Sequence, residues 1–244
     1  MSRALLAALV DDAALFPPGN APMRAALAGH REHRRGPHAE LVGRFLCPAS
    51  RLGELQAELR AGPGDAAAFR LGLIADGTVP ALLTAVELAR ADPGIELEAV
   101  ELRLPADFSE LADLPTDLLS FIEVPRDRLD ALDLLAGTGH AAKLRTGGPT
   151  ADAFPSVAEV AAFLAACTDR DLPYKCTAGL HAAVRHPPYH GFLNVLLGAH
   201  AAATGGDVHS ALSEPDGRTL AKAAAAIDDA QARATRARFA GYGS

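Results

Sequence analysis

Two lysines, Lys143 and Lys175, occupy nearly identical settings: Ala-Ala-Lys-Leu-Arg-Thr-Gly-Gly and Pro-Tyr-Lys-Cys-Thr-Ala-Gly-Leu. The chain has only three lysines against twenty arginines, and the third, Lys222, lies in an alanine-rich segment where we expect a surface residue. Arginine keeps its proton near neutral pH, whereas a buried or crowded lysine amine can become neutral and nucleophilic. The matched lysines therefore indicate chemistry.

Both lysines lie in short segments with the pattern of β-strands, and helical periodicity separates these segments. Strands that alternate with helices predict parallel pairing, and eight such units in about 250 residues predict a (β/α)8 barrel of the TIM type. An open doubly wound sheet is the alternative, although no Gly-x-Gly-x-x-Gly follows the first strand. The predicted strands are Arg44–Pro48, Leu71–Asp76, Ala99–Leu104, Ser120–Val124, Ala141–Thr146, Pro173–Ala178, Gly191–Val195 and Arg238–Gly243.

The helical segments carry recognisable start and stop signals. Ser156 and Glu159 form a capping box, and Gly137 is a helix stop. No helical pattern follows the last predicted strand, so the barrel is expected to lack its last helix. We predict a single domain over 1–244, with 1–40 as an N-terminal cap segment. A helix from about Pro22 in that segment would close the bottom of the barrel or cover a mouth.

Charged residues recur two positions apart in these strands, and residues i and i+2 of a strand share one face. Because charge cannot face the apolar helix layer cheaply, these side chains are expected inside the barrel or at its mouth. A purely structural barrel would be filled with Val, Ile and Leu. The charged residues expected there are Arg44, Glu101, Arg103, Glu123, Lys143, Arg145 and Lys175, and the polar residues Thr177 and Asn194 are expected beside them.

Glycine-rich turns follow the lysine strands and interrupt the last strand. Such turns expose backbone N–H groups that can hold an anion, although turns between strands and helices also need glycine for conformational reasons. We expect a phosphate or carboxylate group of the substrate to bind there, with Arg145 as the complementary charge. The residues concerned are Thr146, Gly147, Gly148, Thr177, Gly179, Gly241 and Gly243.

Lys143 and Lys175 are both predicted to be catalytic; the sequence does not decide which is the nucleophile, and Lys143 is the first candidate. Lys175 on the next strand and Arg145 would crowd it with positive charge while the barrel interior desolvates it. Glu123 is the first candidate for moving protons, and Glu101 the second. The alternative is that Lys143–Glu123 and Arg103–Glu101 are cross-strand ion pairs without chemistry.

The motifs Lys-x-Arg-Thr-Gly-Gly and Lys-x-Thr-Ala-Gly-Leu-His are similar to those of a functionally unassigned set of bacterial (β/α)8 barrels. More distantly, they resemble deoxyribose-phosphate aldolase and its relatives, class I aldolases in which two consecutive strands each carry a lysine before a short glycine turn. That resemblance implies a Schiff-base lysine, a second lysine that sets its pKa, and a phosphate-binding end strand like Arg238-Phe-Ala-Gly-Tyr-Gly-Ser. The predicted strands place the lysines fifth and sixth, whereas the aldolases have them sixth and seventh.

Composition narrows the function classes. The net charge of −7 and the pI near 5.7 disfavour nucleic-acid binding, and the cluster Arg31–Arg35 fits a solvated helix face. We find no apolar stretch of the length that a membrane span needs. Three cysteines without Cys-x-x-Cys spacing indicate reduced thiols and a cytoplasmic protein. The spacings of His181, His186 and His190 match no standard ligand pair, so no metal is predicted.

Three functions remain open. The first is a Schiff-base-forming lyase that acts on a small phosphorylated or carboxylated carbonyl compound without a cofactor. The second is an isomerase or lyase that uses the lysines only for proton transfer or anion binding. The third is a non-catalytic barrel that binds a metabolite. The sequence does not predict the oligomeric state.

Overall fold

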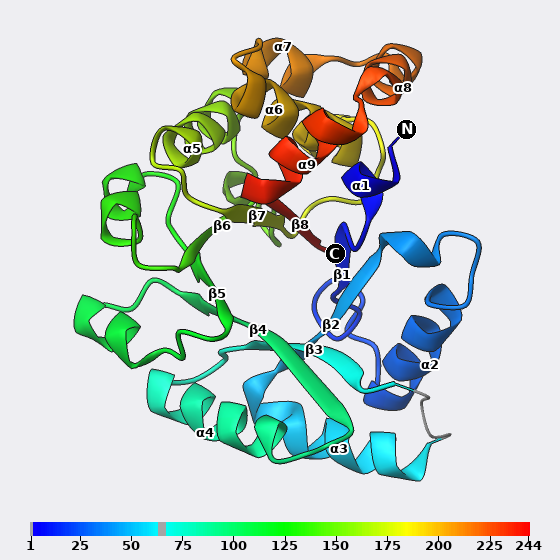
Figure 1. The fold of residues 1–244 in the computed structure, drawn as a ribbon, viewed down its shortest axis with the longest axis vertical. Coiled ribbons are helices and arrows are strands. Elements are labelled where there is room, and N and C mark those ends of the chain that lie inside the picture. The colour runs from blue at the N-terminus through cyan, green and yellow to red at the C-terminus, as the bar shows by residue number, and fades with distance from the viewer. Residues whose placement is uncertain (1, 63–66) are drawn as a thin grey trace.

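The computed structural model of this chain describes residues 2–62 and 67–244. Eight parallel strands close into a barrel in which each strand pairs with the next along the chain and β8 returns to β1 (Figure 1). The predicted TIM-type barrel is therefore confirmed. The strands are β1 (Val10–Asp12), β2 (Val42–Pro48), β3 (Phe69–Ile74), β4 (Ile95–Arg103), β5 (Leu119–Glu123), β6 (Ala141–Arg145), β7 (Tyr174–Thr177) and β8 (Phe239–Gly243).

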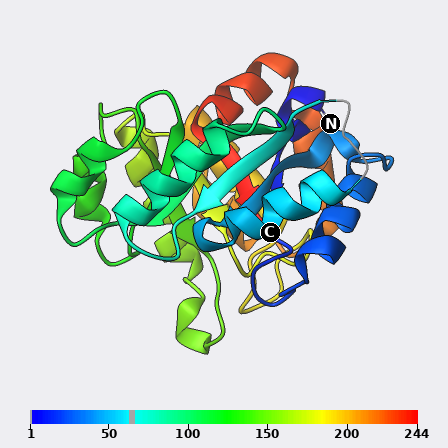
Figure 2. The same ribbon diagram turned by 90° about the horizontal axis from the view of Figure 1, so that it is seen from below.

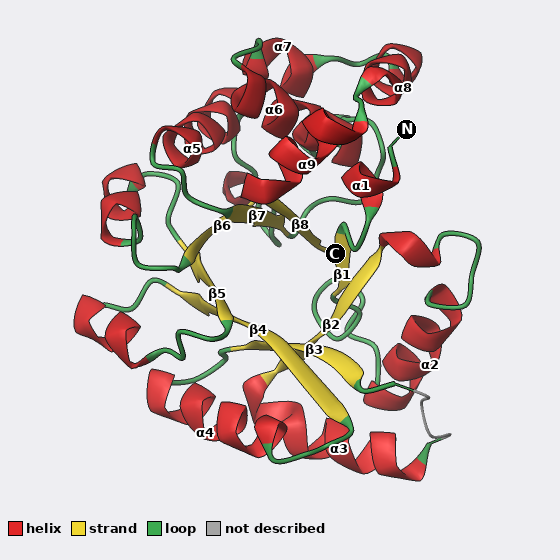
Figure 3. Cartoon of the chain, in the orientation of Figure 1, coloured by secondary structure: helices red, strands yellow, loops and turns green. Residues whose placement is uncertain are grey.

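Helices form a ring outside the strands (Figure 3). The α-helices are α1 (Arg3–Leu6), α2 (Met23–His33), α3 (Leu52–Ala61), α4 (Val79–Arg90), α5 (Val157–Asp169), α6 (Phe192–Thr204), α7 (Val208–Ser213), α8 (Gly217–Ala226) and α9 (Asp229–Arg238). Short 3-10 helices are η1 (Ala39–Leu41), η2 (Ala49–Arg51), η3 (Phe108–Asp113), η4 (Leu129–Leu134) and η5 (Ala151–Ala153). No helix follows β8 in the part of the chain that the structure describes.

Local sequence signals determine where several helices begin. The predicted capping box is present at α5, where the Ser156 hydroxyl accepts from the Glu159 N–H at 3.2 Å and the Glu159 carboxylate accepts from the Ser156 N–H at 2.7 Å. Pro22 precedes the first turn of α2, as expected. Gly137 follows η4 with a φ of +73°, a conformation that suits glycine at a helix stop.

Two predictions of secondary structure were wrong, one near the N-terminus and one after β7. The segment 1–40 is not a cap, because it supplies α1, β1 and α2, the first strand–helix unit. The strand β1 was missed because Val-Asp-Asp is short and polar. The predicted strand Gly191–Val195 is instead the start of α6, whose N-cap is Gly191. The lysines consequently lie on β6 and β7, the sixth and seventh strands.

The barrel interior is layered. Its apolar layer is formed by Ala99, Phe121 and Ala141. Two residues further along the same three strands come Glu101, Glu123 and Lys143, so a charged layer follows the apolar one toward the carboxyl ends of the strands. Figure 2 shows the loops after β1, β6 and β7 extending from that end of the barrel, which we call the mouth.

One segment, Ala151–Asp169, is long and apolar enough to cross a membrane by length and composition alone. The expectation that no apolar stretch reaches that length is wrong for this segment. Its main helix, α5, belongs to the outer ring, and its Val160, Phe163 and Leu164 are buried in the core between helices and strands. Of the apolar window, 28% is buried inside the structure, and these residues include the contacts of α5 with the barrel.

Candidate active site

Lys143 and Lys175 face each other across neighbouring strands. The register of β6 and β7 pairs their Cα atoms directly, and both side chains point into the barrel. Both are buried: Lys175 retains 1% of its accessible surface and Lys143 4%. Their placement on one interior layer, toward the mouth, is what the sequence predicted.

Glu101 of β4 binds both lysines. Its Oε1 lies 2.6 Å from the Nζ of Lys175, and its Oε2 lies 3.1 Å from the Nζ of Lys143. Burial alone would raise the pKa of this carboxyl, but the two ammonium groups outweigh burial and lower it to about 2. Glu101 is therefore ionised at neutral pH and bridges the two amines.

Asp11 of β1 is a site residue that the sequence did not predict. Its Oδ2 lies 2.7 Å from the Nζ of Lys175 and 3.2 Å from Nη1 of Arg44. Its Oδ1 accepts from the backbone N–H of Arg44 at 2.8 Å. A Cβ added at Gly43 would lie 2.3 Å from that same Oδ1, so the carboxylate occupies space that only glycine leaves free.

Glu123 of β5 joins Lys143 to Arg145. Its Oε2 lies 3.2 Å from the Nζ of Lys143, and its Oε1 lies 3.3 Å from the Nε of Arg145. Burial would raise the pKa of Glu123, but the positive charges of Lys143 and Arg145 lower it below its ordinary value. The Arg145 side chain is 45% exposed, so this end of the network reaches the solvent.

These contacts form one chain of alternating charge, which we call the interior network: Asp11, Lys175, Glu101, Lys143, Glu123 and Arg145. The expectation that Lys175 and Arg145 would crowd Lys143 with positive charge is wrong in this geometry, because a carboxylate stands between each pair of cations. The alternative ion pair Lys143–Glu123 is present. The other, Arg103–Glu101, is replaced by the two lysine contacts, and Arg103 is exposed at the end of β4.

The two lysines differ in how firmly they are held. Burial would lower the pKa of Lys175, but the carboxylates of Asp11 and Glu101 outweigh burial and raise it above its ordinary value. The Lys175 Nζ also lies 5.0 Å from the centre of the Phe121 ring, which belongs to the apolar layer. Lys175 is therefore held between two carboxylates at the inner end of the network, and Lys143 lies nearer the exposed Arg145.

Arg44 lies on the side of the charged layer away from the mouth. Its Nε donates to Glu98 of β4 at 2.9 Å, and Glu98 also pairs with Arg70 at the start of β3. Because Arg44 and Arg70 come early in their strands, this second cluster lies toward the amino ends of the strands. The predicted role of Arg44 in substrate binding at the mouth is therefore not supported. Instead, Arg44 holds the Asp11 carboxylate in position.

The glycine turns bring β6, β7 and β8 together at the mouth. A Cβ at Gly147 would lie 2.5 Å from the Cα of Gly179, so the two turns touch through their backbones. The Thr146 hydroxyl donates to the carbonyl of Ala178 at 2.5 Å. Close packing of loops thus explains Gly147 and Gly179, and a Cβ at Gly148 would lie 2.7 Å from Ala153.

The end strand β8 borders Lys175. The Thr177 hydroxyl donates to the Gly243 carbonyl at 3.2 Å, and a Cβ at Gly243 would lie 3.6 Å from the Nζ of Lys175. Gly241 has a structural role, since its φ is +136° and a Cβ there would lie 2.3 Å from the Leu9 carbonyl oxygen. Of the two glycines predicted to bind substrate on this strand, Gly243 is thus the one beside the network.

Asn194 lies apart from the interior network. It is buried in α6, where its amide donates to the carbonyls of Ala211 and Glu214 and its oxygen accepts from the N–H of Arg185. These bonds hold the loops around α6 together. The prediction that Asn194 projects into the barrel was wrong because its segment is helical.

The histidines after β7 do not converge on a metal. His181 is exposed, His186 stacks on Tyr189, and the Nε2 of His190 contacts the carbonyl of Pro155 at 2.7 Å. Over residues 2–62 and 67–244 no group of three or more His, Cys, Asp or Glu side chains is arranged to hold a metal ion.

The chain matches no known family model and no curated protein sequence.

Proposed function

We propose that this protein is a class I lyase that forms a Schiff base between Lys143 and a small anionic carbonyl compound, and makes or breaks a carbon–carbon bond. The observation that carries the proposal is the asymmetry of the two amines. Lys175 is fixed by Asp11 and Glu101, whereas Lys143 contacts two carboxylates, one of which, Glu123, is linked to the exposed Arg145.

The carboxylates supply the proton transfers that imine chemistry needs. In the proposed reaction, Glu123 takes one proton from the Lys143 ammonium, and the neutral amine adds to the carbonyl carbon. Glu123 returns that proton to the former carbonyl oxygen, then carries a second proton from the same nitrogen to that oxygen, which leaves as water, and the iminium with its one remaining N–H is formed. Glu101 stays ionised between Lys143 and Lys175 and stabilises the positive iminium nitrogen.

The iminium then accepts the electron pair of the broken bond. In the cleavage direction, a carboxylate removes the proton of a hydroxyl group on the β carbon, counted from the iminium carbon. The bond between the α and β carbons then breaks, and an enamine and an aldehyde form. Protonation of the enamine carbon and addition of water release the second product and restore the Lys143 amine. The lysine itself activates the carbonyl, so the proposed reaction requires no organic cofactor.

The resemblance to deoxyribose-phosphate aldolase supports this proposal. In that family the two lysines lie on the sixth and seventh strands, and here Lys143 and Lys175 lie on β6 and β7. An anionic substrate is supported by Arg145, the exposed cation of the interior network. The free and buried cysteines are those of a reducing compartment, and we propose a cytoplasmic location.

Borohydride trapping tests the proposal. The protein is incubated with aldehydes, ketones and 2-oxo acids of two to five carbons, with and without a phosphate group, then reduced and weighed by intact-mass measurement. We expect one adduct, which peptide mapping places on Lys143. Lys143→Arg should abolish the adduct and the activity, and Lys222→Arg on exposed α8 is the matched control.

One observation favours a second candidate, an isomerase or lyase without a covalent step. Both amines form ion pairs with carboxylates, and a charged lysine can donate a proton but cannot attack a carbonyl. Absence of any lysine adduct, together with loss of activity in both Lys143→Arg and Lys143→Met, would support this candidate.

A further inference from the structure

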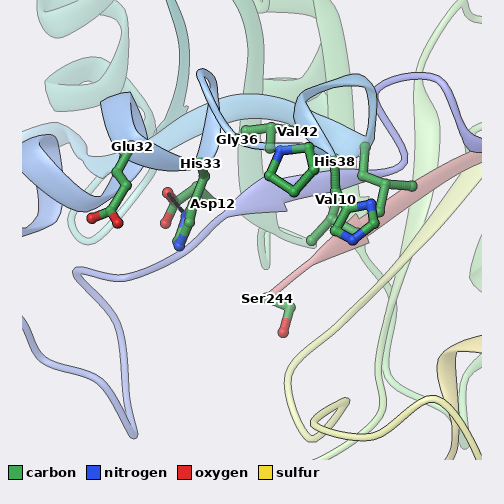
Figure 4. A pocket seen from close by; sticks show the side chains of 10 residues that line it. Val10, Asp12, Glu32, His33, Gly36, His38, Val42 and Ser244 are labelled. Atoms are coloured by element: carbon green, nitrogen blue, oxygen red, sulfur yellow. Dashed lines mark ion pairs between the residues drawn. The ribbon is translucent and has the colours of Figure 1, made fainter.

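A cavity of about 450 Å³ lies apart from the lysine site, on the outer side of β1. Asp11 points inward to Lys175, so its neighbours Val10 and Asp12 on the same strand point outward. The last turn of α2 and the loop that leads to β2 complete the walls. Figure 4 shows Asp12 from the strand beside His33 from the helix.

The cavity combines an apolar wall with carboxylates. Val10 and Val42, paired in the register of β1 and β2, form part of the wall. The Oδ2 of Asp12 lies 3.0 Å from Nδ1 of His30 and 3.8 Å from Nδ1 of His33. The Oδ1 of Asp12 accepts from the Ala14 N–H at 3.0 Å, and the Asp12 side chain is 11% exposed, so a ligand would share these oxygens with the protein.

The acidic side chains of the lining are Asp12 and Glu32. Neither lysine nor arginine lines the cavity within the described ranges. A volume of about 450 Å³ falls within the range of roughly 300–1,000 Å³ that is typical of small-molecule sites.

We propose that this cavity is a second ligand site, which binds a small organic ammonium compound. The apolar part of the ligand lies against Val10 and Val42, and its ammonium group donates hydrogen bonds to Asp12 and Glu32. An anion is the competing class, because Arg34 lies at the edge of the cavity and donates to the carbonyl of Val42 at 3.3 Å. The proposal does not depend on the function of the lysine site.

Three probes of one shape test the charge preference. Pentylamine, pentanol and pentanoate share an apolar chain and differ in the head group. Histidine ring resonances of the full chain are followed by NMR at pH 7.5 during titration, with those of His33 and His38 assigned by substitution. We expect pentylamine alone to shift these two, with a dissociation constant on the order of a millimolar for so small a ligand.

Variants locate the binding. Glu32→Gln should weaken pentylamine binding by about threefold, the effect of one exposed charge partner, while Glu40→Gln, an exposed acid outside the cavity, should have no effect. Val42→Phe fills the cavity and should abolish binding. If Val42→Phe proves unfolded by circular dichroism, the Glu32 and Glu40 variants still decide the question.

The proposal is overturned if pentanoate binds as tightly as pentylamine, or if none of the probes shifts the His33 and His38 resonances. It is also overturned if Glu32→Gln and Glu40→Gln bind pentylamine equally well, because the carboxylate would then have no part in recognition.

Discussion

Replacing Glu101 with glutamine should destabilise the protein in a way that depends on pH. The folded protein lowers the pKa of Glu101 from 4.5 to about 2. At about 1.4 kcal/mol for each pH unit, this corresponds to about 3 kcal/mol of stability from the ionised carboxylate at neutral pH. Breaking a buried ion pair costs about the same, roughly 3–5 kcal/mol.

The sign follows from the two pKa values. A lowered pKa means that the contribution is complete above the unfolded value of 4.5 and is lost as the pH falls from 4.5 toward 2. Glu101→Gln carries no such contribution. The stability difference between the natural protein and the variant should therefore be about 3 kcal/mol at pH 7 and about 1 kcal/mol at pH 3.

Urea unfolding at several pH values measures this difference, and the other carboxylates largely cancel because both proteins contain them. Glu54→Gln, which removes an exposed acid from α3, is the matched control and should change stability by less than about 1 kcal/mol. A difference between Glu101→Gln and the natural protein that stays constant from pH 7 to pH 3 would refute the assignment of Glu101 as the shared, ionised partner of both lysines.

Three further outcomes are expected. Gly43→Ala should destabilise the fold by about 1–3 kcal/mol in urea unfolding, because its Cβ would displace the Asp11 carboxylate, whereas Gly53→Ala in the open helix α3 should be neutral or stabilising. Lys175→Arg should reduce activity severely but spare borohydride trapping at Lys143, and equal loss of both would assign Lys175 a direct part in imine formation. Sulfate or phosphate at millimolar concentration should raise the melting temperature, and Arg145→Ala should remove this effect; no shift with either anion would argue for an uncharged substrate.

Residues on well-formed strands could be predicted from the sequence. Glu101, Glu123, Lys143 and Lys175 lie in apolar segments whose two-residue periodicity assigns each side chain to the interior. Their convergence follows from barrel closure, which the alternation of strands and helices also predicts.

The remaining features depend on contacts that no local pattern reveals. Asp11 lies on a strand of three residues, two of them acidic, and it is a strand only because β2 and β8 pair with it on both sides. The order of charges in the interior network could not be predicted either. The order depends on Glu101 of β4 reaching across the interior to both β6 and β7, and that requires the closed, staggered barrel.

The bond between Lys175 and Asp11 also has a consequence for assembly. It joins residues that are 164 positions apart, across the seam where β8 meets β1. A folding intermediate without that seam would hold Lys143, Glu101 and Glu123 but leave the Lys175 amine with one carboxylate instead of two. Lys175 therefore gains its second carboxylate only when the barrel closes, so a partly assembled chain holds the Lys143 amine without the complete interior network.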